Sequence, residues 1–422
     1  MGCHYKVYVD ILKEELIPAM GCTEPISLAY GGALAKDFLG GETPVKVTAR
    51  CSRNLLKNAM CVKVPNTGGM IGVKAAVVAG LVGGESASKM EVISHLTDGD
   101  REKVRQLLNQ DICTVEMLES PIPLHYILEV QSESHDVIVE ISHKHTHIAR
   151  LSVDGNDLDL ESGQLVQTVP ADRSVLTVEG ILEFAETVDL EDIREVIGRQ
   201  IQDNYTIAEE GLTGKYGVDI GNLILSKEED TVETKMKAYT AAASECRMEG
   251  CPLSVVINSG SGNQGITSSV PVVVYCRENH LPEEKIYRAL VLSNLLTIHQ
   301  KTGIGTLSAF CGAVCASISS AAAITYLKGG GLEEISATLS NSYGGIAGTI
   351  CDGAKATCGF KIYSALSSAF LAGEMALRTK RYPGNTGIIR NTVEDSVQAI
   401  GKLAREGMVD TDKKILQIML ED

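Results

Sequence analysis

The chain has 422 residues, of which 44% are hydrophobic and 22% charged, as in a soluble globular protein large enough for roughly two or three domains. Its formal net charge of −16 argues against nucleic acid or an anionic membrane surface as a partner, because both need clustered Lys and Arg. The first residues lack the apolar stretch of a secretory signal, and twelve cysteines are too few for a disulfide scaffold of this length. We therefore expect a cytoplasmic protein with reduced cysteines.

Residues 4–40 are expected to be helical. Apolar side chains recur at helical spacing over residues 5–14, and a proline and a glycine then end that helix. A second helix is predicted with Pro25 in its first turn and Thr23 as its N-cap. Cys22 then lies in a loop at a helix N-terminus, where the helix dipole lowers the pKa of a thiol and favours bound anions.

The pattern between residues 44 and 170 is richer in strands. Runs of β-branched and aromatic residues predict strands over residues 45–50, 113–117, 125–130, 137–141 and 147–151. Helical spacing predicts helices over residues 71–81 and 102–109. Together these elements predict an α+β module with a mostly antiparallel sheet.

Helices dominate again from residue 174 onward. They are expected over residues 179–188, 190–209, 233–248, 283–299, 305–327, from 345 onward, and 392–406. Residues 302–327 carry no charge, yet their many Gly, Ala, Ser and Thr residues predict a buried helix and not a membrane span. The predicted fold class is therefore α+β. A mainly helical domain of residues 1–42 and 172–422 carries an inserted α+β domain of residues 43–171.

Cys22, Cys311 and Cys351 each lie among glycines and other small residues. Thiolates placed where the backbone can approach closely suit a metal ion or an iron–sulfur cluster, because Cys sulfur is the usual protein ligand of iron clusters. The residues alone leave a second interpretation open, in which all three are buried free cysteines that pack as small hydrophobic side chains.

Two polar, glycine-rich loops are candidate anion sites. Residues 258–265 separate two apolar runs, and residues 64–72 lead from a predicted strand into a helix. Such loops offer backbone N–H groups and hydroxyls to an anion such as a carboxylate. Ordinary turns that need glycine dihedrals would explain both loops as well. The polar candidates are Asn258, Ser259, Ser261 and Asn263 in the first loop and Asn66 and Thr67 in the second.

Lys301 and Lys355 lie near the cysteines in the sequence and are the candidate catalytic bases, with His299 as a third candidate. A lysine that is shielded from water beside a cationic cluster has a lowered pKa and can accept a proton. The alternative for each lysine is an ordinary place on the protein surface.

His143, His145 and His147 alternate along a predicted strand, which is a conceivable metal site because imidazole is a common ligand. Lys144 and a Gly-Asn turn nearby indicate an exposed hairpin. We therefore expect these histidines to form a solvated face.

Five motifs, taken in chain order, resemble those of the L-cysteine desulfidase family, which is related to the α domain of iron–sulfur L-serine dehydratases. The motifs are Gly-Cys-Thr-Glu-Pro at 21–25, Val-Pro-Asn-Thr-Gly at 64–68, Asn-Ser-Gly-Ser-Gly-Asn-Gln-Gly at 258–265, Cys-Gly at 311–312 and Ile-Cys-Asp-Gly-Ala-Lys at 350–355. The resemblance covers nearly the full chain and includes residues 384–388.

The resemblance implies an oxygen-sensitive 4Fe–4S cluster held by Cys22, Cys311 and Cys351, with Cys358 as a further candidate ligand and Cys315 as a packing residue. It also implies β-elimination, in which a protein base removes the Cα proton of an amino acid and sulfide or water leaves. The resulting aminoacrylate hydrolyses to pyruvate and ammonia. The implied substrate contacts are Thr23, Glu24, Asn66, Thr67, Asn258, Ser259, Ser261 and Asn263.

Alternatives to L-cysteine as the substrate remain open. A related iron–sulfur lyase would act on L-serine or another β-substituted amino acid. A non-enzymatic protein would keep the fold and bind a small molecule. A pyridoxal-phosphate lyase would do similar chemistry, but the chain has no recognisable phosphate cup. The expected partner is a small amino acid, without nucleic acid or membrane, and a homodimer is possible.

Overall fold

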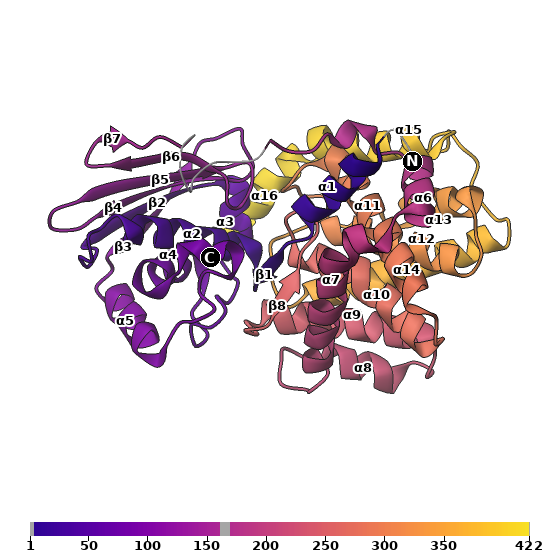
Figure 1. Ribbon diagram of the computed structural model, residues 1–422, viewed down its shortest axis with the longest axis horizontal. Coiled ribbons are helices and arrows are strands. Elements are labelled where there is room, and N and C mark those ends of the chain that lie inside the picture. The colour runs from indigo at the N-terminus through magenta and orange to yellow at the C-terminus, as the bar shows by residue number, and fades with distance from the viewer. Residues whose placement is uncertain (1–3, 161–168, 422) are drawn as a thin grey trace.

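In the computed structural model of the protein, which describes residues 4–160 and 169–421, two lobes lie side by side (Figure 1). One lobe contains a six-stranded sheet with helices packed on it, and the other is helical. The α+β, mainly helical fold class predicted from the sequence is confirmed.

The helices and strands have the following bounds. The α-helices are α1 (Tyr5–Glu15), α2 (Thr23–Asp37), α3 (Arg53–Ala59), α4 (Gly72–Gly83), α5 (Asp98–Asn109), α6 (Val178–Thr187), α7 (Leu190–Gly211), α8 (Ile220–Lys227), α9 (Val232–Met248), α10 (Gly262–Glu278), α11 (Glu283–Ile304), α12 (Gly312–Leu327), α13 (Leu332–Ile346), α14 (Cys358–Leu377), α15 (Val393–Lys402) and α16 (Val409–Met419). The strands are β1 (Pro18–Met20), β2 (Lys46–Ser52), β3 (Cys113–Leu118), β4 (His125–Gln131), β5 (Asp136–Ser142), β6 (Ile148–Val153), β7 (Asn156–Asp157) and β8 (Ser254–Val256). Shorter helical segments are η1 (Ser86–Glu91), η3 (Arg173–Val175) and the π-helical η4 (Leu403–Gly407).

The large sheet has the strand order β3-β2-β4-β5-β6-β7. Only β2 and β3 run parallel, and the other neighbouring strands are antiparallel, as the sequence predicted. Alternate residues of β4, which are Tyr126, Leu128 and Val130, are buried, because a strand turns successive side chains to opposite faces. One face of the sheet is thereby apolar and needs a covering layer.

Helices α2 and α4 supply part of that covering layer. They pack closely against each other because glycines lie at their contact. A Cβ on Gly80 would lie 2.0 Å from the carbonyl oxygen of Ala29, so no larger residue fits there. Helix α2 also contacts β4 and β5, whereas α1 contacts α7 and α11 of the helical lobe. The domain boundaries at residues 42 and 172 stay a prediction, and the packing of α2 favours assigning that helix to the sheet lobe.

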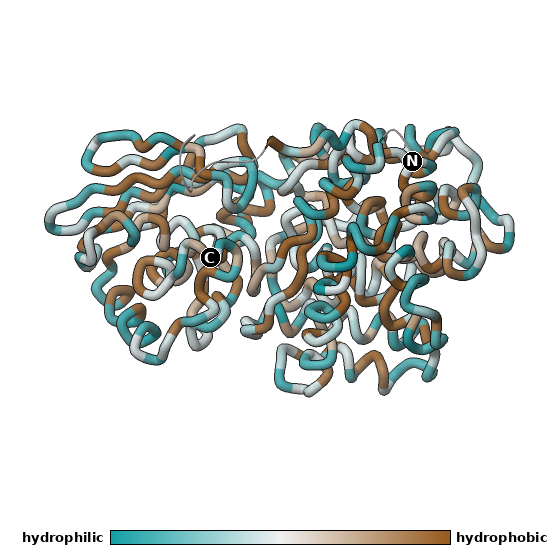
Figure 2. The backbone as a smooth tube through the Cα atoms, in the orientation of Figure 1, coloured by the Kyte–Doolittle hydropathy of each residue, from teal (hydrophilic) through white to brown (hydrophobic). Residues whose placement is uncertain are grey.

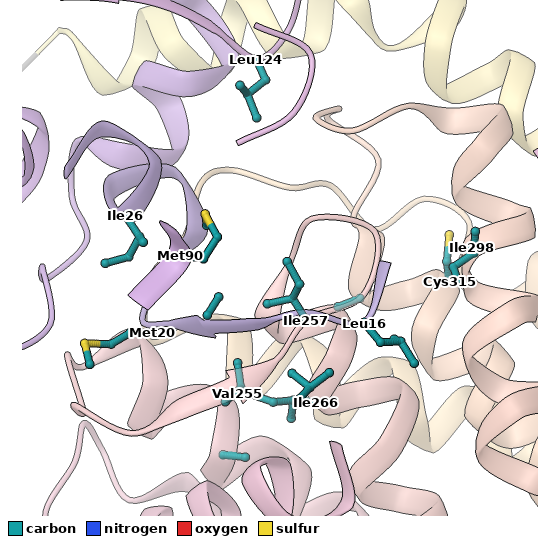
Figure 3. Packing of buried hydrophobic residues seen from close by; sticks show 14 of the residues in the cluster. Leu16, Met20, Ile26, Met90, Leu124, Val255, Ile257, Ile266, Ile298 and Cys315 are labelled. Atoms are coloured by element: carbon teal, nitrogen blue, oxygen red, sulfur yellow. The ribbon is translucent and has the colours of Figure 1, made fainter. Parts of the chain in front are cut away.

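A short two-stranded sheet joins the two lobes. Strand β1 pairs antiparallel with β8, with Pro18 opposite Val256. Figure 3 shows buried side chains on this connection, among them Met20 of β1 and Val255 of β8. Since α2 begins directly after β1, the pairing fixes the start of α2, and with it Cys22, at the junction between the lobes.

The helical lobe is built around α12, which is buried along most of its length among α10, α11, α13 and α14. Hydrophobic residues follow the inner helices of this lobe, and hydrophilic residues gather at its outer loops (Figure 2). Within residues 4–160 and 169–421, no helix is both long enough and apolar enough to span a membrane.

Some predicted boundaries are wrong. Helix α12 starts at Gly312 and not at residue 305, because α11 continues to Ile304 and an extended segment follows it. Residues 348–353, predicted to be helical, lie outside the helices, and α14 begins only at Cys358. The apolar run after the first glycine-rich loop, residues 267–275, for which no element was predicted, is part of helix α10.

The histidine prediction also needs correction. Residues 143–147 form the turn between β5 and β6, so the three histidines do not share a strand face. His143 is exposed, but His145 is only 6% exposed because the turn folds over the start of α2. The Ser27 hydroxyl donates a hydrogen bond to the His145 carbonyl at 2.6 Å and holds the turn there.

Candidate functional site

Four helices begin at one cavity between the lobes. Cys22, Ser261 and Cys311 are the N-cap residues of α2, α10 and α12, and Cys358 is the first residue of α14. The cavity has about 720 Å³ of space between protein atoms, its open mouth included. The starts of four helices at one cavity favour an anion there, because a helix N-terminus carries N–H groups without intrahelical partners and the positive end of the helix dipole.

The lining of the cavity combines apolar surface with many polar and charged side chains. Its polar residues are Cys22, Thr23, Glu24, Asn58, Arg247, Ser261, Asn263, Gln264, Lys301, Thr306, Ser308, Cys311, Cys351, Cys358 and Lys361. All four cysteines predicted as cluster ligands are in this set, although they come from segments more than 300 residues apart in the chain.

The four thiols are shielded from water to different degrees. Cys22 and Cys311 are buried, and Cys351 and Cys358 are half-buried. Burial, together with the neighbouring Cys351 and Cys358, raises the pKa of Cys311 to about 12. Cys22 packs in one small apolar cluster with Cys358. Burial also raises the pKa of Cys22 and Cys358, so a bound cation would be needed to hold these two thiols and Cys311 as thiolates.

Cys315 is one turn further along α12 and does not line the cavity. It is fully buried beside Ile298 of α11 (Figure 3). These contacts agree with the packing role that the resemblance implies.

Within the described ranges 4–160 and 169–421, no three His, Cys, Asp or Glu side chains are placed to hold a single metal ion. In a 4Fe–4S cube each thiolate binds a different iron, so its ligands are spaced more widely than those of one ion. Four thiols around one cavity, with cations and helix N-termini behind them, are a donor set that fits an iron–sulfur cluster.

Glu24 is a buried carboxylate beside Cys22. Its Oε2 accepts hydrogen bonds from the Cys22 thiol and the Thr23 hydroxyl, both at 3.1 Å, and its Oε1 accepts one from the Asn58 amide at 3.3 Å. Burial alone would raise the pKa of Glu24, but the His145 imidazole, 3.9 Å away, and the Cys22 thiol lower it to about 2. Glu24 is thus a fixed negative charge in the cavity.

The structure separates the two predicted lysines. Lys301, in the last turn of α11, is 5% exposed and lines the cavity. Burial lowers the pKa of Lys301, and no hydrogen-bond partner of its amine is found in the described parts of the chain. Lys355 lies outside the cavity lining and pairs with Asp352 at 2.8 Å. His299 also lies outside the lining and binds Glu394 at 2.7 Å.

The first glycine-rich loop contributes two of its four predicted contacts. Ser261 and Asn263 line the cavity. Asn258 is fully buried and donates to the Asn294 side chain at 2.9 Å, while the Ser259 hydroxyl donates to Asn258 at 2.8 Å. Asn258 and Ser259 therefore hold the loop in shape.

The second loop does not line the cavity. The Asn66 amide donates to the carbonyls of Ile93 and Ser94 at 3.0 and 2.9 Å. The Thr67 hydroxyl donates to the Val64 carbonyl at 2.7 Å. These polar groups are used within the loop and its neighbours.

The polar lining residues that the sequence did not single out are Asn58, Arg247, Gln264, Thr306, Ser308 and Lys361, of which only Gln264 lies in a recognised motif. Arg247 lies at the end of α9, in a segment that reads as an ordinary helix. Lys361 lies one turn into α14, three residues after Cys358, and this spacing was the only clue available.

Comparison with known proteins agrees with this geometry. The model of the family described as serine dehydratase alpha chain matches residues 87–417, a span that contains Cys311, Cys351 and Cys358 but not Cys22. A UPF0597 protein of Lachnoclostridium phytofermentans is 43% identical over 416 residues, which are 99% of this chain and 100% of that protein. UPF0597 proteins of Desulfitobacterium hafniense and Treponema denticola are each 42% identical over 99% of this chain, and over 97% and 98% of their own lengths. The chain therefore belongs to the serine dehydratase alpha-chain family, a family of serine dehydratase-like lyases.

Proposed function

We propose that this protein is an L-cysteine desulfidase, a lyase that converts L-cysteine and water to pyruvate, ammonia and sulfide. The observation that carries the proposal is the meeting of Cys22, Cys311, Cys351 and Cys358 at one cavity that also contains a buried lysine. We further propose the reducing cytoplasm as its location, because every cysteine in the described ranges is free. A homodimer remains a proposal as well.

The donor set supports a 4Fe–4S cluster as the cofactor. Cys22, Cys311 and Cys351 would hold it, with Cys358 as the further candidate. When bound, such a cluster supplies a Lewis acid that draws charge from the substrate's β-substituent. Burial raises the pKa of Cys22 and Cys311 although both lie at helix N-termini, so the thiolate form that cluster binding needs would be held by the bound iron.

Lys301 is the proposed base. Its buried amine has a lowered pKa and no protein partner in the described chain, so it can be neutral and free to take the Cα proton. The electron pair of that C–H bond forms the Cα–Cβ double bond as the Cβ–S bond breaks, and sulfur leaves as sulfide. The aminoacrylate then takes up water and gives pyruvate and ammonia.

Thr23, Ser261 and Asn263 are proposed to orient the substrate beside Lys301. Each lines the cavity and presents a hydroxyl or amide group. Holding the Cα–H bond toward the amine before reaction lowers the entropic part of the barrier.

L-Serine is a second candidate substrate, which the description of the matching family favours. The same residues would remove the Cα proton, and water would leave in place of sulfide. A hydroxyl is the poorer leaving group, so relative kcat/KM values for L-cysteine and L-serine separate the two candidates.

The test is anaerobic purification followed by iron and sulfide analysis and by assays for sulfide from L-cysteine and pyruvate from L-serine. We expect a coloured protein that contains iron and sulfide and releases more product from L-cysteine. A colourless protein that acts on neither amino acid would overturn the proposal and leave a non-enzymatic binding protein.

A further inference from the structure

Arg247 is a buried cation that the protein leaves only partly bonded. Its side chain lies at the end of α9, lines the cavity, and is among the largest fully buried side chains. Nη1 donates to Oδ1 of Asn263 at 3.1 Å. Nε and Nη2 have no hydrogen-bond partner, and no carboxylate of residues 4–160 or 169–421 forms an ion pair with Arg247. A buried charge in this state is costly, so a group that is not part of the described chain is expected to complete it.

The two unpartnered nitrogens share one edge of the guanidinium. This edge presents two parallel N–H groups and binds both oxygens of a carboxylate. A Cβ on Gly262 would lie 2.2, 2.4 and 2.7 Å from Nε, Cζ and Nη2. Gly262 therefore lies close against this side of the guanidinium, and a larger residue there would press on Nε and Nη2.

The charges around the cavity also favour an anion. Arg247, Lys301 and Lys361 line it, against the single lining carboxylate of Glu24. Lys361 is already paired with Asp352, and the buried Lys301 amine is suited to a neutral base. Arg247 therefore supplies the fixed positive charge that lacks a partner.

Unpartnered acceptors lie in the same cavity. Oε1 of Gln264 and Oδ1 of Asn58 are buried without a hydrogen-bond partner. The orientation of the Asn58 amide is set by its donation to Glu24 at 3.3 Å, which leaves Oδ1 as the free atom. Both residues line the cavity that contains the Glu24 carboxylate, and free acceptors there suit an ammonium group, as the unpartnered nitrogens of Arg247 suit a carboxylate.

We propose that Arg247 binds the α-carboxylate of a small amino acid through Nε and Nη2, while Gln264 and Asn58 accept hydrogen bonds from its ammonium group. The inference rests on the proposed function, since it takes the reacting molecule to be an amino acid. The inference identifies Arg247 as the residue that selects molecules with a free α-carboxylate. Amines and amides of similar shape should therefore bind weakly.

The test measures equilibrium binding of L-alanine, which has no β-leaving group, by calorimetry on the anaerobic holoenzyme. L-Alaninamide is the matched probe without a carboxylate. We expect wild type to bind L-alanine at least tenfold more tightly than L-alaninamide. R247Q and G262A should each weaken L-alanine binding at least tenfold and remove the preference for L-alanine over L-alaninamide. In assays with L-cysteine, R247K should raise KM by a larger factor than it lowers kcat. R288Q is the matched control, because Arg288 is a mostly buried arginine on α11 outside the cavity lining.

Iron and sulfide content is measured for every variant. The inference would be overturned if R247Q bound L-alanine with wild-type affinity. It would also be overturned if R247Q lost part of its iron but the molecules that kept the cluster bound L-alanine with wild-type affinity. No detectable binding of L-alanine to wild type would overturn it too. Binding through Arg247 without any sulfide or pyruvate from the wild type would sink the proposed function and leave the carboxylate site standing.

Discussion

Phe310 and Ile350 form an isolated antiparallel β-bridge. Beside it, the amide of Cys351 donates a hydrogen bond to the carbonyl of Ala309 at 2.7 Å. The bridge joins the segment before α12 to the segment before α14, so Cys311 and Cys351 reach the cavity from two adjacent extended segments. Backbone pairing therefore sets the spacing of two proposed cluster ligands.

A buried ion pair makes hydrogen bonds to both segments of this bridge. The amine of Lys57, on α3, pairs with Asp412, on α16, and donates to the Cys351 carbonyl at 3.1 Å. Asp412 in turn accepts a hydrogen bond from the Ala309 amide at 2.9 Å. The sheet lobe and the C-terminal helix thus both position the cysteine segments.

Replacement of Lys57 by Met should be strongly destabilising. It leaves Asp412 without its cation, and removing one partner of a buried ion pair costs about 3–5 kcal/mol. The free energy of unfolding in urea measures the loss. K74M is the control, because the pair of Lys74 with Asp111 is exposed and is worth less than about 1 kcal/mol. Equal losses in the two variants would contradict a structural role for the buried pair.

Substitution of the proposed ligands should remove the cluster. C311A and C351A are each expected to lose the visible colour, most of the iron and most of the sulfide after anaerobic purification, because each removes one thiolate from the donor set. C276A is the control, since Cys276 is a fully buried free cysteine outside the cavity lining. Wild-type iron content in C311A would rule out Cys311 as a ligand.

Lys301 should control turnover and its pH dependence. K301M removes the proposed base and is expected to lower kcat by about 10²–10⁴-fold. Burial lowers the pKa of Lys301, and the neutral amine is the active form, which accumulates as the pH rises. Wild-type kcat should therefore reach its plateau at a pH below 10.5, the ordinary pKa of a lysine amine. K355M should keep both kcat and the profile, because Lys355 pairs with Asp352 outside the cavity lining. A K301M enzyme with wild-type kcat would exclude this role.

Glu394 and His299 should contribute to stability and not to catalysis. Burial would raise the pKa of Glu394, but the hydrogen bonds from His299 and from the Val178 amide, both 2.7 Å, lower it below 4.5. Since the folded pKa is lower than the unfolded one, the carboxylate stabilises the protein above pH 4.5, and this contribution is lost as pH falls through the folded pKa.

E394Q tests this contribution. The difference in melting temperature between wild type and E394Q should be largest near neutral pH and shrink as pH falls below 4.5. E374Q is the control, since its pair with Lys328 is more exposed. A difference that does not change with pH would show that the charge of Glu394 is not involved.

Local patterns in the sequence were sufficient for most elements of the fold. Alternation identified strands such as β4, and helical spacing identified α1 and α9, because both periodicities follow from the backbone of the segment itself. The predicted helix boundaries were wrong where a contact with a distant segment determines where the helix begins. The start of α12 depends on the bridge at Phe310, whose partner is forty residues away.

The sequence by itself singled out Cys22, Cys311 and Cys351 as candidate ligands, since motifs of glycines and small residues around them can be recognised locally. Only the tertiary structure decided which polar residues join them. It brought in Lys301 and Arg247 and left Lys355 outside the cavity lining, although Lys355 is closest in sequence to a proposed ligand. The physical reason is that a side chain's burial and partners depend on segments that meet only when both lobes have packed around the junction at β1 and β8.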